Sequence, residues 1–264
     1  MNNLLDDRFG YCEADHAQYV KNGFRIFDHF LTPTGLADCR QHIDRMLGQL
    51  HPDIPSDAII GTHLIEHWVW ELATHPAILD MVERQIGPNI TFWSSHLIAK
   101  PPHTGRPVPW HQDGVEWTNV NGKFGASVWI AFDDVDEVSG TMAVVPGGHA
   151  RGALPRIQHA VEHDVFKWDM DLRELPPNLD EIKVYYNMKA GQAAIHDVMM
   201  PHESGPNLSD QWRRAMVFRY IAPDGELGSS TYYDYRNGDP MPRIFFLVRG
   251  EDVHGLGLPR HPFD

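Results

Sequence analysis

The spacing of hydrophobic positions in the first third of the chain predicts helices. Over residues 34–50, apolar side chains recur every three or four positions, which is typical of an amphipathic helix with one face toward a core. Residues 76–86 repeat the pattern, with proline in the first turn and Gly87-Pro88 as a stop. Residues 13–22 predict a shorter helix that ends at Gly23. We therefore expect the N-terminal part, about residues 1–88, to be largely helical.

After residue 88 the pattern changes to short strands. Residues 90–100 and 124–132 are rich in β-branched and aromatic side chains, and glycine or proline follows most such runs. Further candidate strands are residues 24–30, 141–145, 182–188, 192–197 and 214–221. Many short strands broken by glycine and proline favour a jelly roll or barrel over alternating β–α units. The sequence thus predicts a mainly β fold with flanking N-terminal helices.

The remaining C-terminal part, about residues 223–264, has no clear period and many aromatic residues. We expect it to pack across the barrel or to form a lid. The 264 residues suit one large domain, and they contain no internal repeat, low-complexity tract or linker. We therefore expect a single domain over residues 1–264, with its β core at about 89–222.

Composition narrows the possible partners. The formal net charge of -14 argues against a nucleic-acid partner and against docking on anionic lipid. No apolar run approaches the roughly 20 residues that span a bilayer, and the first residues do not have the pattern of a signal peptide. The two cysteines cannot build a disulfide framework, so we expect a cytoplasmic protein. The 17 histidines suggest a metal site.

Two histidines and one carboxylate form the facial triad that binds Fe(II) in non-haem oxygenases. The first pair is commonly His-x-Asp on a strand, where residues i and i+2 point to the same side. Three such tripeptides begin at His42, His51 and His111. The first lies in a predicted helix and the second in a loop, so a solvated face and turn chemistry explain them. Only the third lies in the β-rich region, which makes His111 and Asp113 the candidate ligands.

The second histidine ligand should lie on a later strand. His202 is followed by Ser204 and, at the start of a predicted strand, by Arg213 and Arg214. A buried arginine beside an iron site suits a dicarboxylate cosubstrate, because a guanidinium binds a carboxylate through two parallel hydrogen bonds. The 2-oxo acid end would then occupy two open metal positions and leave the third for O2. The candidates for this ligand are His149, His159, His163, His196, His202, His254 and His261.

Several motifs follow one another in a set order. They are Lys100-Pro-Pro, Trp110-His-Gln-Asp-Gly, Ser127-Val-Trp-Ile-Ala-Phe-Asp-Asp-Val, Ser139-Gly-Thr-Met-Ala-Val-Val-Pro-Gly-Gly-His149, His202-Glu-Ser-Gly-Pro-Asn-Leu-Ser and Trp212-Arg-Arg-Ala. Together they resemble the phytanoyl-CoA dioxygenase family over roughly residues 15–222. That family consists of Fe(II)- and 2-oxoglutarate-dependent oxygenases built on a double-stranded β-helix, a jelly-roll or cupin-like barrel.

The resemblance implies a role for each matching position. The iron ligands would be His111, Asp113 and His202, and Arg213 rather than Arg214 would bind the distal carboxylate of 2-oxoglutarate. Ser204 would be its hydroxyl partner, while Trp129 and His96 would line the cosubstrate pocket. Gln192, Glu203 and Gly148 depart from the family pattern, but none of these changes removes a ligand. The presence of Asp113 argues against the halogenase variants, which lack this carboxylate.

Other readings stay open for several residues. His196 is a rival to His202, with the same strand parity, although the spacing to Arg213 favours His202. Lys100 is an alternative carboxylate anchor, although a lysine at a strand end is usually exposed to solvent. The candidates for substrate contact are Trp117, Tyr232, Tyr235 and Arg236, for which core or lid packing is an equal alternative.

We therefore expect a dioxygenase that uses Fe(II), 2-oxoglutarate and O2 to oxidise an unactivated C–H bond of a small molecule. Hydroxylation is the expected outcome, with release of succinate and CO2, while desaturation and ring formation would use the same ligands. No basic cluster suits the phosphates of coenzyme A, so we expect a free small-molecule substrate. An aromatic box for a cationic headgroup is one possibility.

Two other classes of function remain. One is a non-catalytic, metal-containing β-barrel that binds a small molecule. The other is a zinc hydrolase, which is disfavoured because the sequence contains no His-Glu-x-x-His motif. The oligomeric state is not indicated by the sequence.

Overall fold

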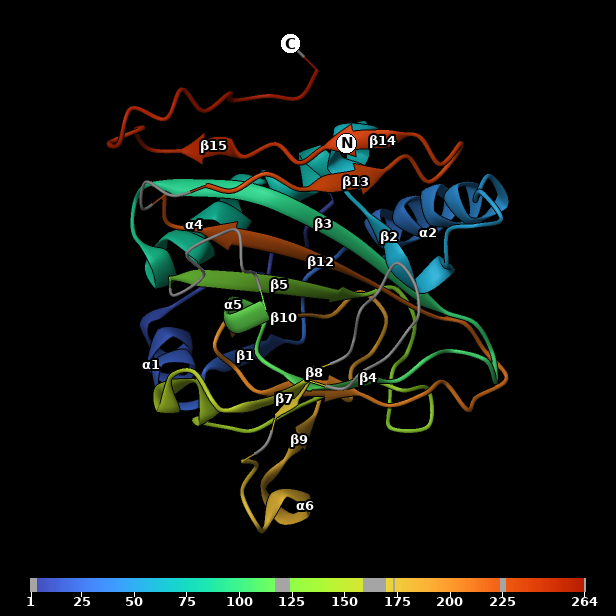
Figure 1. Ribbon diagram of the computed structural model, residues 1–264, viewed down its shortest axis with the longest axis vertical. Helices are drawn as coiled ribbons and strands as arrows, with labels where there is room; N and C mark the ends of the chain where they lie inside the picture. Colours follow the sequence, from blue (N-terminus) through green and yellow to red (C-terminus); the bar gives the residue numbers. More distant parts are fainter. Residues whose placement is uncertain (1–3, 117–123, 159–169, 173, 224–226, 264) are drawn as a thin grey trace.

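Two antiparallel β-sheets face each other in the computed structural model, which describes residues 4–116, 124–158, 170–172, 174–223 and 227–263 (Figure 1). The large sheet has the order β1 (Phe24–Phe27), β10 (Ala193–Asp197), β5 (Gly125–Ala131), β12 (Arg213–Ile221), β3 (Ile90–Lys100) and β15 (Phe246–Arg249), and β2 (Ile59–Ile60) also pairs with β3. The small sheet has the order β4 (Val108–His111), β11 (His202–Ser204), β6 (Met142–Val144) and β9 (Val184–Tyr185). This is the predicted jelly roll.

Helices from the N-terminal part cover the outer face of the large sheet. They are α1 (Glu13–Asn22), α2 (Pro33–Gly48), α3 (His67–Ala73) and α4 (Pro76–Ile86), with the short turns η1 (Ser56–Ala58) and η2 (Thr62–Leu64) between them. Ile43 of α2 and Val82 of α4 share one buried apolar cluster with Val128 of β5 and Phe218 of β12. The large sheet is therefore shielded from water on its helical side.

Alternation along the strands sends every second side chain to the other face, between the two sheets. Val217 of β12 and Trp129 of β5 belong to a separate buried cluster with Val144 of the small sheet. Strand register aligns His96 of β3 with Val217 and Val217 with Trp129. Polar side chains on this inner face therefore point toward the small sheet.

The remaining elements are short. They comprise α5 (Asp113–Glu116), η3 (Gly148–Arg151), β7 (Arg156–Gln158), β8 (Met170–Leu172), α6 (Leu179–Ile182), β13 (Thr231–Tyr233) and β14 (Pro240–Pro242). Within the described ranges, no helix is both long and apolar enough to cross a membrane.

Most predicted elements form within a few residues of their expected bounds, but three expectations are wrong. The strand expected at residues 24–30 stops at Phe27. Only Val184 and Tyr185 form a strand in the segment 182–188, because Ile182 ends helix α6. The C-terminal part is not irregular throughout, since β13 pairs with β14 and β15 extends the large sheet beside β3. The burial of Phe246 and Leu247 stabilises β15 at that edge of the sheet.

A glycine substitution tests how α1 connects to β1. Gly23 ends α1 in the left-handed region, with φ of 80°, and a Cβ there would collide with the side chains of Met200 and His149. We expect Gly23→Ala to lower the free energy of unfolding by about 1–2 kcal/mol or more. Gly48→Ala is the matched control, since a Cβ on this helical residue meets open space and should stabilise by up to about 1 kcal/mol. Urea denaturation measures both, and equal effects would contradict this account.

Candidate metal centre

His111 and His202 lie directly opposite each other in the small sheet. They are paired residues of β4 and β11, their ring centroids are 4.0 Å apart, and both side chains are buried. The Nδ1 atoms lie 2.8 Å from the Pro109 carbonyl oxygen and 2.9 Å from the Met200 carbonyl oxygen, respectively. A carbonyl can only accept, so each Nδ1 donates, and Nε2 is the ring nitrogen left for a metal.

Asp113 reaches the same point by a route that the sequence did not predict. The expected His-x-Asp strand ends at His111, and Asp113 begins α5 instead. Gln112 between them is fully buried, and its side-chain amide donates to the carbonyl oxygens of Met199 at 2.7 Å and Gly152 at 2.9 Å. This anchored turn leaves Asp113 Oδ1 3.6 Å from His111 Nε2.

His111, Asp113 and His202 offer donor atoms that all lie within 4.8 Å of one another, the one such group of three found in the described part of the chain. Burial acts to raise the pKa of Asp113, but Arg219 and the two histidines outweigh it, and the pKa lies well below its usual range. Burial and the neighbouring His111 lower the pKa of His202. Two histidine imidazoles and one carboxylate are the donor set of non-haem Fe(II) sites with open positions.

His196 lies near this group without joining it. Its ring centroid is 5.4 Å from that of His202, and its Nδ1 has no hydrogen-bond partner among the described residues. Burial lowers the pKa of His196 to about 4. The structure therefore brings His202, rather than its rival, to His111 and Asp113. Of the other candidates, His159 and His163 lie outside the described residues.

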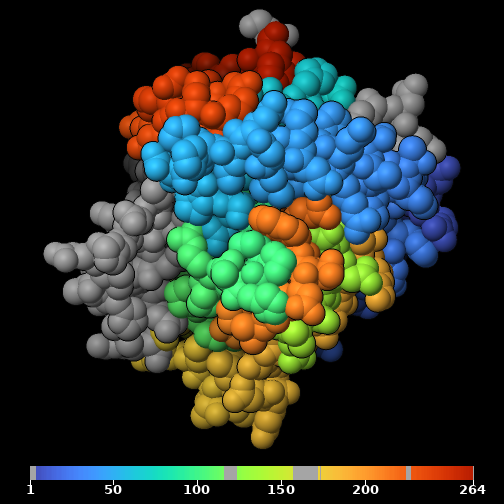
Figure 2. All heavy atoms as spheres, turned by 90° about the vertical axis from the view of Figure 1, so that its right-hand side faces the viewer, coloured from blue at the N-terminus to red at the C-terminus, as the bar shows by residue number. Residues whose placement is uncertain are grey.

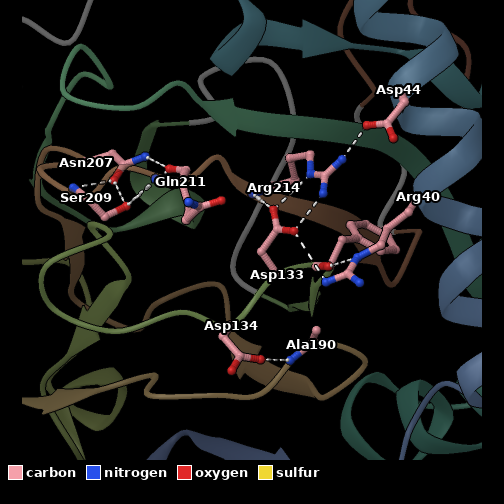
Figure 3. A network of polar contacts seen from close by, with 10 residues as sticks. Arg40, Asp44, Asp133, Asp134, Ala190, Asn207, Ser209, Gln211 and Arg214 are labelled. Carbon is pink, nitrogen blue, oxygen red and sulfur yellow. Dashed lines mark hydrogen bonds and ion pairs between the residues drawn. The ribbon is translucent and has the colours of Figure 1, made fainter.

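Arg213 and Arg214 point to opposite faces of the large sheet. Arg213 is buried in the space between the sheets, where its Nη2 donates to the Gly140 carbonyl oxygen at 2.7 Å and its guanidinium lies 5.7 Å from the Trp129 ring centroid. Its Nη1 has no partner in the part of the chain that the structure describes. Arg214 instead binds Asp133 at 2.7 Å and Asp44 of α2 on the outer face (Figure 3).

Lys100 contradicts the expectation of an exposed strand end. Its side chain is 0% exposed, and Nζ donates to Ser204 Oγ at 2.8 Å and to the Gly205 carbonyl oxygen at 2.6 Å. The cause is tertiary, because Lys100 is paired with Arg213 across β3 and β12 and its side chain enters the same interior. Burial, with a smaller contribution from Arg213, lowers the pKa of Lys100 to about 6.

These residues surround one cavity between the sheets. Its lining includes Asp57, His96, Lys100, Arg106, His111, Asp113, Trp129, His196, His202, Ser204, Arg213 and Arg219. His96 Nε2 lies 3.0 Å from the Asp57 carbonyl oxygen, and burial lowers the pKa of His96 to about 3. The metal donors therefore share a cavity with Arg213, Ser204, Trp129 and His96.

The residues expected at the substrate side do not line this cavity. The Tyr232 hydroxyl donates to the Trp93 carbonyl oxygen at 3.0 Å, and the Tyr235 hydroxyl donates to Glu66 Oε1 at 2.6 Å. Arg236 forms an ion pair with Asp234. These contacts correspond to the alternative in which the three residues serve core or lid packing. Trp117 lies outside the described residues.

Sequence reasoning missed two residues that hold the carboxylate. Gln112 anchors the turn before Asp113, and Arg219 Nε donates to Asp113 Oδ2 at 3.2 Å. Arg219 has the same strand parity as Arg213, so the predicted strand carried a usable signal. Gln112 carried none, because its partners at residues 152–154 and 199 are distant in sequence.

The sequence of the chain is similar to those of several known proteins. Residues 19–215 match the family model described as phytanoyl-CoA dioxygenase. A probable alpha-ketoglutarate-dependent hypophosphite dioxygenase of Stutzerimonas stutzeri is 30% identical over 184 residues, which cover 66% of this chain and 61% of that protein. The chain spans between about half and two thirds of the length of the curated relatives it matches.

Solved structures agree in fold. A non-heme monooxygenase, ThoJ in its apo form, superposes with a TM-score of 0.71 at 27% identity, covering 94% of this chain and 90% of that one. EvdO2 from Micromonospora carbonacea var. aurantiaca, complexed with 2-oxoglutarate, gives 0.65 at 25% identity, covering 91% and 98%. Because the family model matches residues 19–215, which is most of the chain, the chain belongs to the phytanoyl-CoA dioxygenase family.

Proposed function

We propose that this protein is an Fe(II)- and 2-oxoglutarate-dependent oxygenase that hydroxylates a C–H bond of a small molecule and releases succinate and CO2. One observation carries the proposal: a single cavity is lined both by the group of two histidines and one aspartate and by the buried Arg213 of the large sheet. A zinc hydrolase would need a metal site but no buried arginine beside it. Family membership supports the same class.

His111, Asp113 and His202 would hold the iron and leave its remaining positions open. When bound, Fe(II) supplies the activation of O2 and the oxidising power. The protein contributes rigidity, since carbonyl oxygens fix both imidazole rings, and Gln112 and Arg219 fix the carboxylate. Fixed ligands of this kind hold the open positions in one place.

Arg213, Ser204 and Trp129 would bind 2-oxoglutarate. The unpartnered Nη1 of Arg213 is a donor that a distal carboxylate would satisfy, and Trp129 forms the wall against which the guanidinium rests. Burial strengthens this pairing because little water competes for the charges. The 2-oxo acid end then extends toward the histidines of the small sheet.

The substrate would bind at the other end of the cavity. Arg213 and Arg219 are six residues apart on β12, roughly 20 Å at the rise of a strand, so the cosubstrate at Arg213 leaves the end near Arg219 and His196 open. His196 Nδ1, which has no hydrogen-bond partner among the described residues, offers a polar atom there. We infer a small polar substrate, a class to which the hypophosphite in the name of the S. stutzeri relative also belongs.

Succinate release tests the proposed function. The protein, supplied with Fe(II), 2-oxoglutarate and O2, should form succinate, and the correct substrate in a panel of small polar molecules should accelerate this release. A protein that binds iron but forms no succinate above an iron-only control, with or without the panel, would instead be the non-catalytic binding protein.

Two neighbouring buried histidines test the metal ligands. His202→Ala should lose most bound Fe(II), because it removes one of three donors. His196→Ala removes a similarly buried imidazole outside the donor group and should keep the iron stoichiometry. Metal analysis after anaerobic loading measures both variants. Loss of iron in His196→Ala alone would reverse the assignment.

Two neighbouring arginines test the cosubstrate site. Removing one partner of a buried charge pair costs roughly 3–5 kcal/mol, so Arg213→Gln should raise the KM for 2-oxoglutarate about a hundredfold or more. Arg213→Lys should recover only part of the affinity for 2-oxoglutarate, because an ammonium group cannot form the two parallel hydrogen bonds of a guanidinium. Arg214→Gln should keep the wild-type KM while lowering stability through its lost contacts with Asp133. The reverse pattern would show that the two roles are exchanged.

A further inference from the structure

Lys100 and Arg213 form an unusual pair of buried cations. They face each other across β3 and β12, and their exposed fractions are 0% and 1%. Like charges at directly opposed strand positions destabilise a sheet, and burying a charge without a counter-ion costs more still. Such a pair calls for a compensating group or for the loss of one charge.

Loops cover Lys100 at this end of the cavity. Gly105 forms a β-bridge with Asn207, and the Asn207 side-chain amide donates to the carbonyl oxygens of Lys100 at 3.0 Å and Pro101 at 3.1 Å. Figure 2 shows the green segment around residues 101–107 beside the orange segment around 205–212 on the molecular surface. These contacts keep the Lys100 side chain out of solvent, at 0% exposure.

The acidic groups around Lys100 do not neutralise the pair. Asp57 of η1 and Glu203 of β11 act to raise the pKa of the lysine, while Arg213 of β12 and Arg106 of the 101–107 loop act to lower it. Asp57 is already held by Arg106, at 3.1 Å between Asp57 Oδ2 and Arg106 Nε. Burial outweighs all of these, and with the pKa at about 6 the amine is mainly neutral at pH 7.5 in the ligand-free protein.

The hydrogen bonds of Lys100 fit a neutral amine. Its two short bonds, to Ser204 Oγ and to the Gly205 carbonyl oxygen, use only two N–H groups. A third N–H exists only in the ammonium form, and the remaining acceptor near Nζ, the Ser204 carbonyl oxygen, is 3.5 Å away. Ser204 Oγ accepts from Lys100 and so keeps its own proton to donate. Arg213 Nη1, the Ser204 hydroxyl and the N–H that Lys100 gains on protonation would then give one anion three donors.

We propose that Lys100 is a second anchor for the distal carboxylate of 2-oxoglutarate and that it takes up one proton from solvent as this carboxylate binds. This inference rests on the proposed function. The neutral amine plus one proton gives the ammonium, and no bond of 2-oxoglutarate is broken. The carboxylate supplies the negative charge that makes two adjacent cations tolerable, so binding and protonation occur together.

Titration calorimetry tests the proton uptake. Anaerobic Fe(II)-loaded protein is titrated with 2-oxoglutarate at pH 7.5 in buffers of different ionisation enthalpy, which reports protons taken up per ligand bound. The wild type should take up close to one proton. Lys100→Met should abolish this uptake and raise Kd at least tenfold. Lys189→Met, at an exposed lysine paired with Asp134, should match the wild type.

A control ligand tests the proton uptake without any substitution in the protein. 2-Oxopentanoate keeps the 2-oxo acid end but has a methyl group in place of the distal carboxylate, so the wild type should bind it without proton uptake. The Kd of 2-oxoglutarate itself should rise up to tenfold per pH unit above about pH 6, because the free protein must gain a proton that becomes scarcer.

The outcomes separate the two proposals. Binding of 2-oxoglutarate without proton uptake, or with the same uptake in Lys100→Met or with 2-oxopentanoate, overturns the inference and leaves the proposed function intact. Failure of the iron-loaded wild type to bind 2-oxoglutarate at all overturns both.

Discussion

The antiparallel pairing of β4 with β11 determines the position of the metal donors, because it sets His111 directly opposite His202. A slip of one residue in that register would turn one imidazole to the far face of the sheet and separate the two Nε2 atoms. Asp113 then needs only the turn anchored by Gln112 to reach them. The large sheet, packed against its helical cover, presents Arg213 to the same cavity.

The same burial that organises the site also makes its charges costly. Asp113 is stabilised by Arg219 and by the histidines, and a divalent cation would add to this. Lys100 and Arg213 have no comparable counter-ion in the described structure, and burial lowers the pKa of both, that of Arg213 to about 10. One end of the cavity thus favours a cation and the other favours an anion. A 2-oxo dicarboxylic acid bound at both ends would satisfy both preferences.

Much of the fold could be predicted from local signals. Helix α4 and strand β3 have their predicted bounds because proline, glycine and a consistent hydrophobic period mark them. Motif spacing predicted that His202 and Arg213 belong to one site, and both line the cavity. The burial of Lys100 could not be predicted, because it depends on the pairing with Arg213 of β12 and on the loop that contains Asn207. The orientations of Tyr232 and Tyr235 could not be predicted either, because their hydrogen-bond partners lie far away in the sequence.

The most direct test of the central claim is a crystal structure of the protein grown without oxygen in the presence of Fe(II) and 2-oxoglutarate. We expect one iron bound by His111, Asp113 and His202, with the distal carboxylate of 2-oxoglutarate against Arg213 and Ser204. An iron bound through His196, or a 2-oxoglutarate carboxylate placed at Arg219 with Arg213 still unpartnered, would contradict the account.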